Sequence, residues 1–136
     1  MLGIPYSTAI DIWSFGCILA ELYLGYPIFP GENENDLMSR IIEICGEPPE
    51  NLLLLSERKM KFFYSNEILN KLEPIMLKNS KGELRKPHGK PLNYILGNED
   101  PDFNDFLIKC LDWNPETRLT PEEALRHIWI LKGLPP

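Results

Sequence analysis

The chain has 136 residues, of which 43% are hydrophobic and 25% charged, a size that suits one globular domain or a part of a larger one. Asp and Glu number 20 against 14 Lys and Arg, so the net charge of −6 gives no support for a nucleic-acid partner. Three cysteines without a C-x-x-C pair indicate free thiols in a reducing compartment, and no secretory signal is visible. We therefore expect an intracellular protein, in the cytoplasm, the nucleus or both.

The most hydrophobic stretch covers residues 10–25 and is interrupted by Asp11, Ser14 and Glu21. At ~100° per residue these three polar groups share one sector of a helix that ends near Gly25. Two charges near a bilayer centre would each cost roughly 2.5 to 3.5 kcal/mol, which argues against a membrane span. The pattern predicts a buried helix, capped by Ser7 or Thr8, in which the Asp11 carboxylate needs partners.

A second helix is predicted over residues 36–45, with Asn33 or Asn35 as its cap and Gly46 as its end. Its apolar side chains form one stripe, namely Leu37, Met38, Ile41, Ile42 and Cys45. The acidic residues at its start favour capping and a solvated face over a binding role.

Residues 47–98 are the ambiguous part of the chain, with one short helix expected from about Leu52. Pro, Gly and Lys interrupt the short apolar runs there, and Glu83 is the one acid within a basic stretch. The basic residues of that stretch are Lys78, Lys81, Arg85, Lys86 and Lys90. A solvated loop is the favoured interpretation, and a site for phosphate or an acidic partner is the alternative.

Two further helices are predicted near the C-terminus. Asp100 is the predicted cap of the first of these helices and Pro101 its first residue, and an amphipathic stripe of apolar residues follows. Thr120 and Glu123 have the spacing of a capping box, ahead of a helix that includes Ile128 and Trp129 in its buried face. No strand alternation stands out, so the predicted fold class is mainly α.

Two motifs carry a resemblance to a known family. The run D-I-W-S-F-G at residues 11–16 resembles the D-x-W-S-x-G signature that opens the central helix of the large lobe in eukaryotic protein kinases. The run at residues 113–125 is similar to the kinase pattern W-x-P-x-x-R-x-T-x-x-x-A-L, and the H-I-W that follows departs from the usual H-P-W at Ile128. The resemblance implies the helical C-terminal part of that lobe, helices F to I, spread over residues 1–136 with an insert at about 47–98.

Within kinases, residues 25–34 and the I-C-G-E-P-P turn at residues 44–49 resemble the DYRK (dual-specificity tyrosine-phosphorylation-regulated kinase) family. Cyclin-dependent and mitogen-activated kinases are the alternative relatives, since they share the insert. The resemblance implies transfer of the γ-phosphate of ATP to Ser or Thr of protein substrates, with Mg²⁺. Tyrosine autophosphorylation is implied by family likeness alone.

The site residues that the resemblance implies are supporting ones. Asp11, with Trp13, would hold the shape of the catalytic loop, and Arg118 would pair with a glutamate that ends the activation segment. Glu21 would contact an arginine of the substrate, or form an internal bond at the helix end. No catalytic, cofactor-binding or metal-binding residue is expected in this chain.

Phosphoryl transfer needs a glycine-rich loop, a paired lysine, a catalytic Asp and a metal-binding Asp, and the sequence has no G-x-G-x-x-G, V-A-I-K or H-R-D run. We therefore expect a kinase fragment that is inactive alone and that has the missing kinase portion as a partner. The alternative is a non-catalytic protein-binding module derived from a kinase lobe. Loss of the partners of Asp11 and Arg118 predicts marginal folding, because breaking a buried ion pair costs ~3 to 5 kcal/mol.

Overall fold

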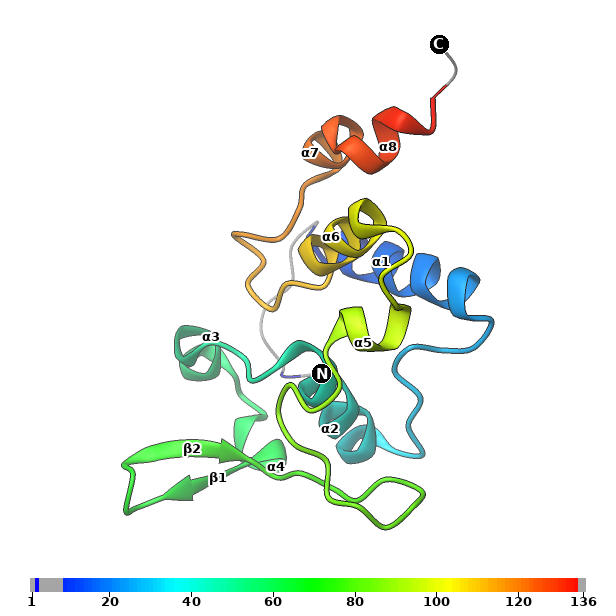
Figure 1. Cartoon of the computed structure of the whole chain (residues 1–136). Coiled ribbons are helices and arrows are strands. Elements are labelled where there is room, and N and C mark those ends of the chain that lie inside the picture. The colour runs from blue at the N-terminus through cyan, green and yellow to red at the C-terminus, as the bar shows by residue number, and fades with distance from the viewer. Residues whose placement is uncertain (1, 3–8, 135–136) are drawn as a thin grey trace. The chain divides into compact units, whose positions relative to one another are not determined.

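The computed structural model describes Leu2 and residues 9–134, and this part of the chain is mainly helical (Figure 1). It divides into two compact units. The helical unit comprises residues 9–28 and 92–134, and the hairpin unit comprises Leu2 and residues 29–91. The predicted caps Ser7 and Thr8 lie outside the described residues. No helix within the described ranges is long and apolar enough to cross a membrane.

The helical unit is built on the contact between its two longest helices. They are α1 (Ala9–Leu24) and α6 (Pro101–Cys110), followed by α7 (Pro121–Arg126) and α8 (Ile128–Lys132), with α5 (Leu92–Leu96) ahead of α6. The core of this unit consists of Ile12, Phe106, Cys110, Leu119 and Ala124. Leu19, Trp129 and Ile130 pack against it. The predicted Asp100 cap of α6 is confirmed, since its side chain accepts the backbone N–H of Phe103.

The C-terminal helix that the sequence predicts is two helices in the structure. The Thr120 and Glu123 capping box forms in full, with both reciprocal bonds. Helix α7 then ends at Arg126, because His127 has an extended backbone and its ring nitrogen caps α8 instead. The expectation that Ile128 and Trp129 belong to the same helix as Ala124 is therefore wrong.

The burial predicted for the first helix is wrong on one face. Residues whose side chains project into one sector of α1 are exposed, namely Ile10, Asp11, Ser14, Phe15, Ile18, Glu21 and Leu22. The three polar residues do share that sector, as predicted, but apolar side chains stand between them, with Ile18 55% and Leu22 76% exposed. The opposite face, which includes Ile12, Gly16 and Ala20, is buried.

The hairpin unit begins with α2 (Glu34–Cys45) and continues through α3 (Glu50–Leu55) and α4 (Lys59–Phe62). Asn33 caps α2 by accepting the N–H of Asp36, and Gly46, at φ 81°, ends it as predicted. Strands β1 (Phe63–Asn66) and β2 (Lys71–Pro74) then pair antiparallel, from Phe63 opposite Pro74 to Asn66 opposite Lys71 (Figure 1).

These strands correct the expectation that the chain has none. Each has four residues, too short for alternation to stand out from a mixed background. The turn between the strands is stabilised by residues within it. The Asn66 side chain accepts the N–H groups of Ile68 and Leu69, and Asn70 has a positive φ.

The basic stretch after β2 is largely exposed, as a solvated loop would be, but its backbone is hydrogen-bonded to α2. The Ser39 hydroxyl, fully buried, accepts the N–H of Leu77 at 3.0 Å. Further along, the N–H groups of His88 and Lys90 donate to the carbonyls of Ile42 and Glu43 at the end of α2, at 3.1 Å each. These carbonyls lie in the last turn of the helix, where few intrahelical donors remain, and the Ile42 carbonyl also accepts the N–H of Gly46 at 2.8 Å.

Candidate functional site

A cluster of two tryptophans and one arginine lies in the helical unit. Trp13 comes from α1, whereas Trp113 and Arg118 come from the loop between α6 and α7. The Arg118 guanidinium carbon is 5.3 Å from the centroid of the Trp13 ring, a cation–π distance. The Trp13 and Trp113 rings are 5.8 Å apart between centroids, with their planes tilted by 38°. Two of the predicted site residues, Trp13 and Arg118, are therefore in contact.

Hydrogen bonds fix the Arg118 guanidinium within its own loop. Its Nε donates to the Asp112 carbonyl at 2.8 Å and its Nη2 to the Trp113 carbonyl at 3.2 Å. Burial lowers the pKa of Arg118 from its usual range, and the charge of Asp112 opposes that shift. An arginine stays protonated in proteins, so the site holds a half-buried positive charge over the Trp13 ring.

The loop that carries Arg118 is ordered by short polar side chains. The Asp112 carboxylate accepts the N–H of Asn114 at 3.0 Å and the hydroxyl of Thr117 at 2.6 Å. Asn114 in turn accepts the N–H of Glu116 at 3.0 Å through its side chain. Such Asx-type bonds stabilise turns locally, so the position of Arg118 follows from the residues beside it in sequence.

Gly16 is the reason that α1 and α6 approach so closely. A Cβ atom at this position would lie 2.8 Å from the Cβ of Cys110 and 3.2 Å from a methyl group of Leu111. Both neighbours are buried. The glycine of the D-x-W-S-x-G signature thus has a packing role, which brings the helix that carries Trp13 against the segment that leads to Arg118.

Asp11 and Glu21 do not join this cluster. Asp11 precedes Trp13 by two residues, which places the two side chains about 200° apart around the helix, and its side chain is exposed. The expectation of a buried carboxylate at Asp11 is therefore wrong. Glu21 is also exposed, and its charge contributes to the raised pKa of Cys17, after burial.

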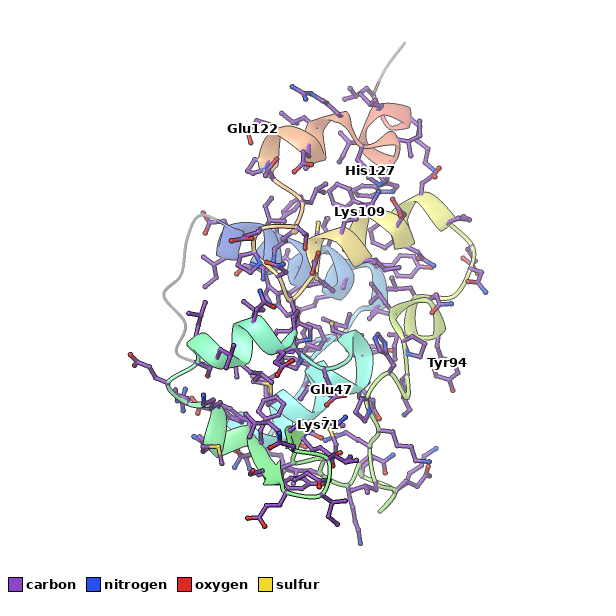
Figure 2. The ribbon with its side chains drawn as sticks, turned by 90° about the vertical axis from the view of Figure 1, so that its left-hand side faces the viewer. Glu47, Lys71, Tyr94, Lys109, Glu122 and His127 are labelled. Carbon is purple, nitrogen blue, oxygen red and sulfur yellow. The ribbon has the colours of Figure 1, made fainter. Side chains whose placement is uncertain are left out.

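Sequence reasoning missed the polar contact that anchors α8. His127 lies with its Nε2 2.7 Å from an Asp105 carboxylate oxygen, and its Nδ1 accepts the N–H of Trp129 at 3.0 Å. Because Nδ1 accepts, the ring carries its proton on Nε2 and donates it to Asp105. Lys109 binds the same carboxylate at 3.0 Å, and Figure 2 labels Lys109 on α6 and His127 between α7 and α8. The His127 bond, with Lys109 second, lowers the pKa of Asp105.

The thiols and acids of the described residues form no evident metal site. No group of three or more His, Cys, Asp or Glu side chains within residues 9–134 gathers as metal ligands would. None of the three cysteines forms a disulfide within the described residues. Burial raises the pKa of Cys17 to about 11 and that of Cys110 to about 12, so both are protonated and poorly nucleophilic at neutral pH.

Comparison with known proteins decides the family. A family model described as protein kinase domain matches residues 2–130. The chain belongs to the protein kinase domain family. The match includes both motifs, and with them Trp13, Trp113 and Arg118, so the predicted kinase resemblance is confirmed.

The curated relatives also confirm the likeness to the DYRK family. Human dual specificity tyrosine-phosphorylation-regulated kinase 4 is 45% identical over 96% of this chain, which covers 24% of that kinase. Kinase 2 of the same series from Drosophila melanogaster is 47% identical over 93% of the chain and 17% of the kinase. The fission-yeast DYRK-family kinase pom1 is 43% identical over 93% of the chain and 11% of its own length. The chain thus spans a quarter or less of these relatives.

Proposed function

We propose that this chain is the C-terminal helical part of the large lobe of a DYRK-like protein kinase. The longer enzyme would transfer the γ-phosphate of ATP to Ser or Thr of protein substrates, with dual specificity inferred from the names of the relatives. The support is the identity of 40 to 47% to DYRK kinases over most of the chain. The small share of those kinases that is covered supports a role as one part of a longer protein.

The observation that carries this proposal is the Trp13, Arg118 and Trp113 cluster. In it a guanidinium is fixed by two backbone carbonyls and stacked on an indole. An arginine held in this way is suited to bind a carboxylate with defined geometry. We infer that the carboxylate belongs to the glutamate that ends the activation segment, which this sequence does not show.

Asp11 and Glu21 are proposed to act on groups outside the chain. The exposed Asp11 carboxylate, in the first turn of α1, would accept backbone N–H groups of the catalytic loop and fix its shape. Glu21, exposed near the other end of the same helix, would contact an arginine of the protein substrate. Both roles need an accessible carboxylate, and the structure of α1 is compatible with them.

ATP and Mg²⁺ do not fit the residues of this chain. The sequence has no glycine-rich phosphate loop and no H-R-D run, and residues 9–134 contain no cluster of carboxylates with metal-ligand geometry. We therefore propose that nucleotide and metal bind to the remainder of the kinase. The chain alone would supply the scaffold that supports the catalytic loop and the activation segment.

A non-catalytic binding module is the second candidate function. The exposed sector of α1, in which Ile18 and Leu22 stand beside acidic groups, is an apolar surface that a partner protein could cover. The first candidate assigns the same surface to the missing kinase portion.

The transcript upstream of the Met1 codon separates the two functions. An open frame that encodes the glycine-rich loop, the paired lysine and the catalytic-loop motifs would support the kinase fragment. An in-frame stop codon close to Met1, together with expressed protein of 136 residues, would contradict it and favour the binding module.

A further inference from the structure

A basic cavity in the hairpin unit has no role in the proposed kinase scaffold. It has a volume of about 530 Å³ and is lined by residues of the α2 N-terminus and of the basic stretch after β2. Its charged lining residues are Arg40, Lys81, Arg85 and Lys90 against Glu32 and Asp36. An excess of positive charge here contrasts with the net charge of −6 for the whole chain.

Two of these cations form ion pairs with carboxylates of the same unit. Arg85 binds Asp36, and Arg40 binds Glu43, whose side chain is 4% exposed. The arginine side chains are themselves 10% and 15% exposed, respectively. A buried ion pair is seldom retained for stability alone, since apolar residues of similar volume often serve as well. We take the pairs as a device that orients two guanidinium groups.

The two guanidinium groups have hydrogen-bonding capacity left over. Neither Arg40 Nε nor Arg85 Nε has a hydrogen-bond partner among the described residues, although both atoms are buried. Arg85 Nε is 3.9 Å from a Glu43 oxygen, too far for a hydrogen bond. An unsatisfied buried donor is unfavourable, so the described residues do not fully satisfy these two guanidinium groups.

Lys81 and Lys90 are the other two cations in the lining of the cavity. Neither forms an ion pair with any residue that the structure describes. Their backbones are nevertheless fixed. The Asn79 side chain accepts the N–H of Lys81 at 2.9 Å, and the N–H of Lys90 donates to the Glu43 carbonyl at 3.1 Å. The ordered backbones hold both lysines in the lining of the cavity.

We propose that this cavity binds the phosphate group of a phosphoserine or phosphothreonine in a partner protein. A phosphate monoester carries nearly two negative charges and three acceptor oxygens, which match arginine forks and lysine ammonium groups. One compact cavity suits one phosphate, whereas a nucleic acid needs a track of several phosphate contacts. All of its lining residues belong to the hairpin unit, so it shares no residue with the Trp13 and Arg118 cluster.

Nuclear magnetic resonance of the arginine Nε–H groups tests the proposal directly. The probes are a capped five-residue peptide with one phosphoserine, the same peptide with serine, and inorganic phosphate. We expect the phosphopeptide to shift the Arg40 and Arg85 signals, phosphate to shift them at higher concentration, and the serine peptide to leave them unchanged. Identical shifts with sodium chloride at equal ionic strength would overturn the proposal. Tighter binding of free phosphate than of the phosphopeptide would contradict the proposal that the ligand is a phosphorylated protein segment.

Two matched double variants separate this site from general attraction. Lys81→Ala with Lys90→Ala removes two charges at the cavity, and we expect about tenfold weaker phosphopeptide binding. Lys78→Ala with Lys86→Ala removes two charges from the same stretch but outside the cavity lining, and the affinity should stay within about twofold. Equal weakening in the two double variants would contradict a defined site.

Discussion

At the scale of single residues, Arg118 shows how a short motif determines a site. Its guanidinium makes directional bonds to the Asp112 and Trp113 carbonyls and stacks on Trp13. These contacts use the planar fork of arginine, which lysine lacks. The W-x-P-x-x-R spacing matters because the loop bonds of Asp112 and Asn114 set where the guanidinium lies.

Replacing Arg118 by lysine should therefore lower stability although the charge is kept. We expect a loss of about 1 to 3 kcal/mol in the free energy of unfolding, because two carbonyl acceptors lose their donors in a half-buried site. Urea unfolding followed by tryptophan fluorescence measures it. Arg126→Lys is the matched control, since Arg126 is exposed in the last turn of α7. Equal effects of the two variants would contradict the account.

Gly16 offers a second test at this scale. Gly16→Ala places a methyl group 2.8 Å from the Cys110 Cβ, and overpacking of this kind costs about 1 to 3 kcal/mol. The control is Gly133→Ala, where the backbone has φ −84° and the nearest atom lies 3.5 Å away. That variant should be neutral or slightly stabilising in thermal unfolding. A neutral Gly16→Ala would show that α1 and α6 do not pack as described.

At the scale of elements, the sequence predicts the helix caps and helix ends well, because residues close in sequence determine them. The caps at Asn33, Asp100 and Thr120 and the end of α2 at Gly46 follow from local hydrogen bonds and backbone preference. The β hairpin was missed because four-residue strands carry little periodicity. The start of α8 was missed because it depends on His127, whose ring is held by Asp105, 22 residues away.

The contact between α6 and α8 gives the stability of the chain a dependence on pH. The His127 and Lys109 bonds lower the pKa of Asp105 in the folded state. A carboxyl with a lowered folded pKa contributes stability above its unfolded pKa of about 3.9 and loses it as the pH falls through the folded value. The contribution is modest, since the Asp105 side chain is half exposed.

Asp105→Asn isolates this contribution from that of other acids. Asparagine can still accept the His127 proton but carries no charge, so the variant should be less stable than the original chain at pH 7. The difference should shrink as the pH falls to about 3, measured by urea unfolding at each pH. A difference that is the same at both values would rule out the charged contact as its source.

At the scale of the whole molecule, the exposed sector of α1 should show in solution. The sequence predicted a helix buried all round, whereas Ile18 and Leu22 are exposed, because burial depends on what covers a helix and not on its own composition. We expect a broad thermal transition and binding of a dye that fluoresces on apolar surface. The double variant Ile18→Glu with Leu22→Glu should reduce dye binding without loss of helix signal. A sharp cooperative melt of monomer without dye binding would contradict this.

We propose that this chain supports phosphoryl transfer by a longer kinase but does not perform it alone. The most direct measurement is Mg²⁺-dependent transfer of labelled γ-phosphate from ATP to a protein substrate. The purified chain should be assayed beside the longer protein read from its transcript. We predict transfer by the longer protein and none by the chain of 136 residues. Transfer by the chain alone, or none by the longer protein, would contradict the account.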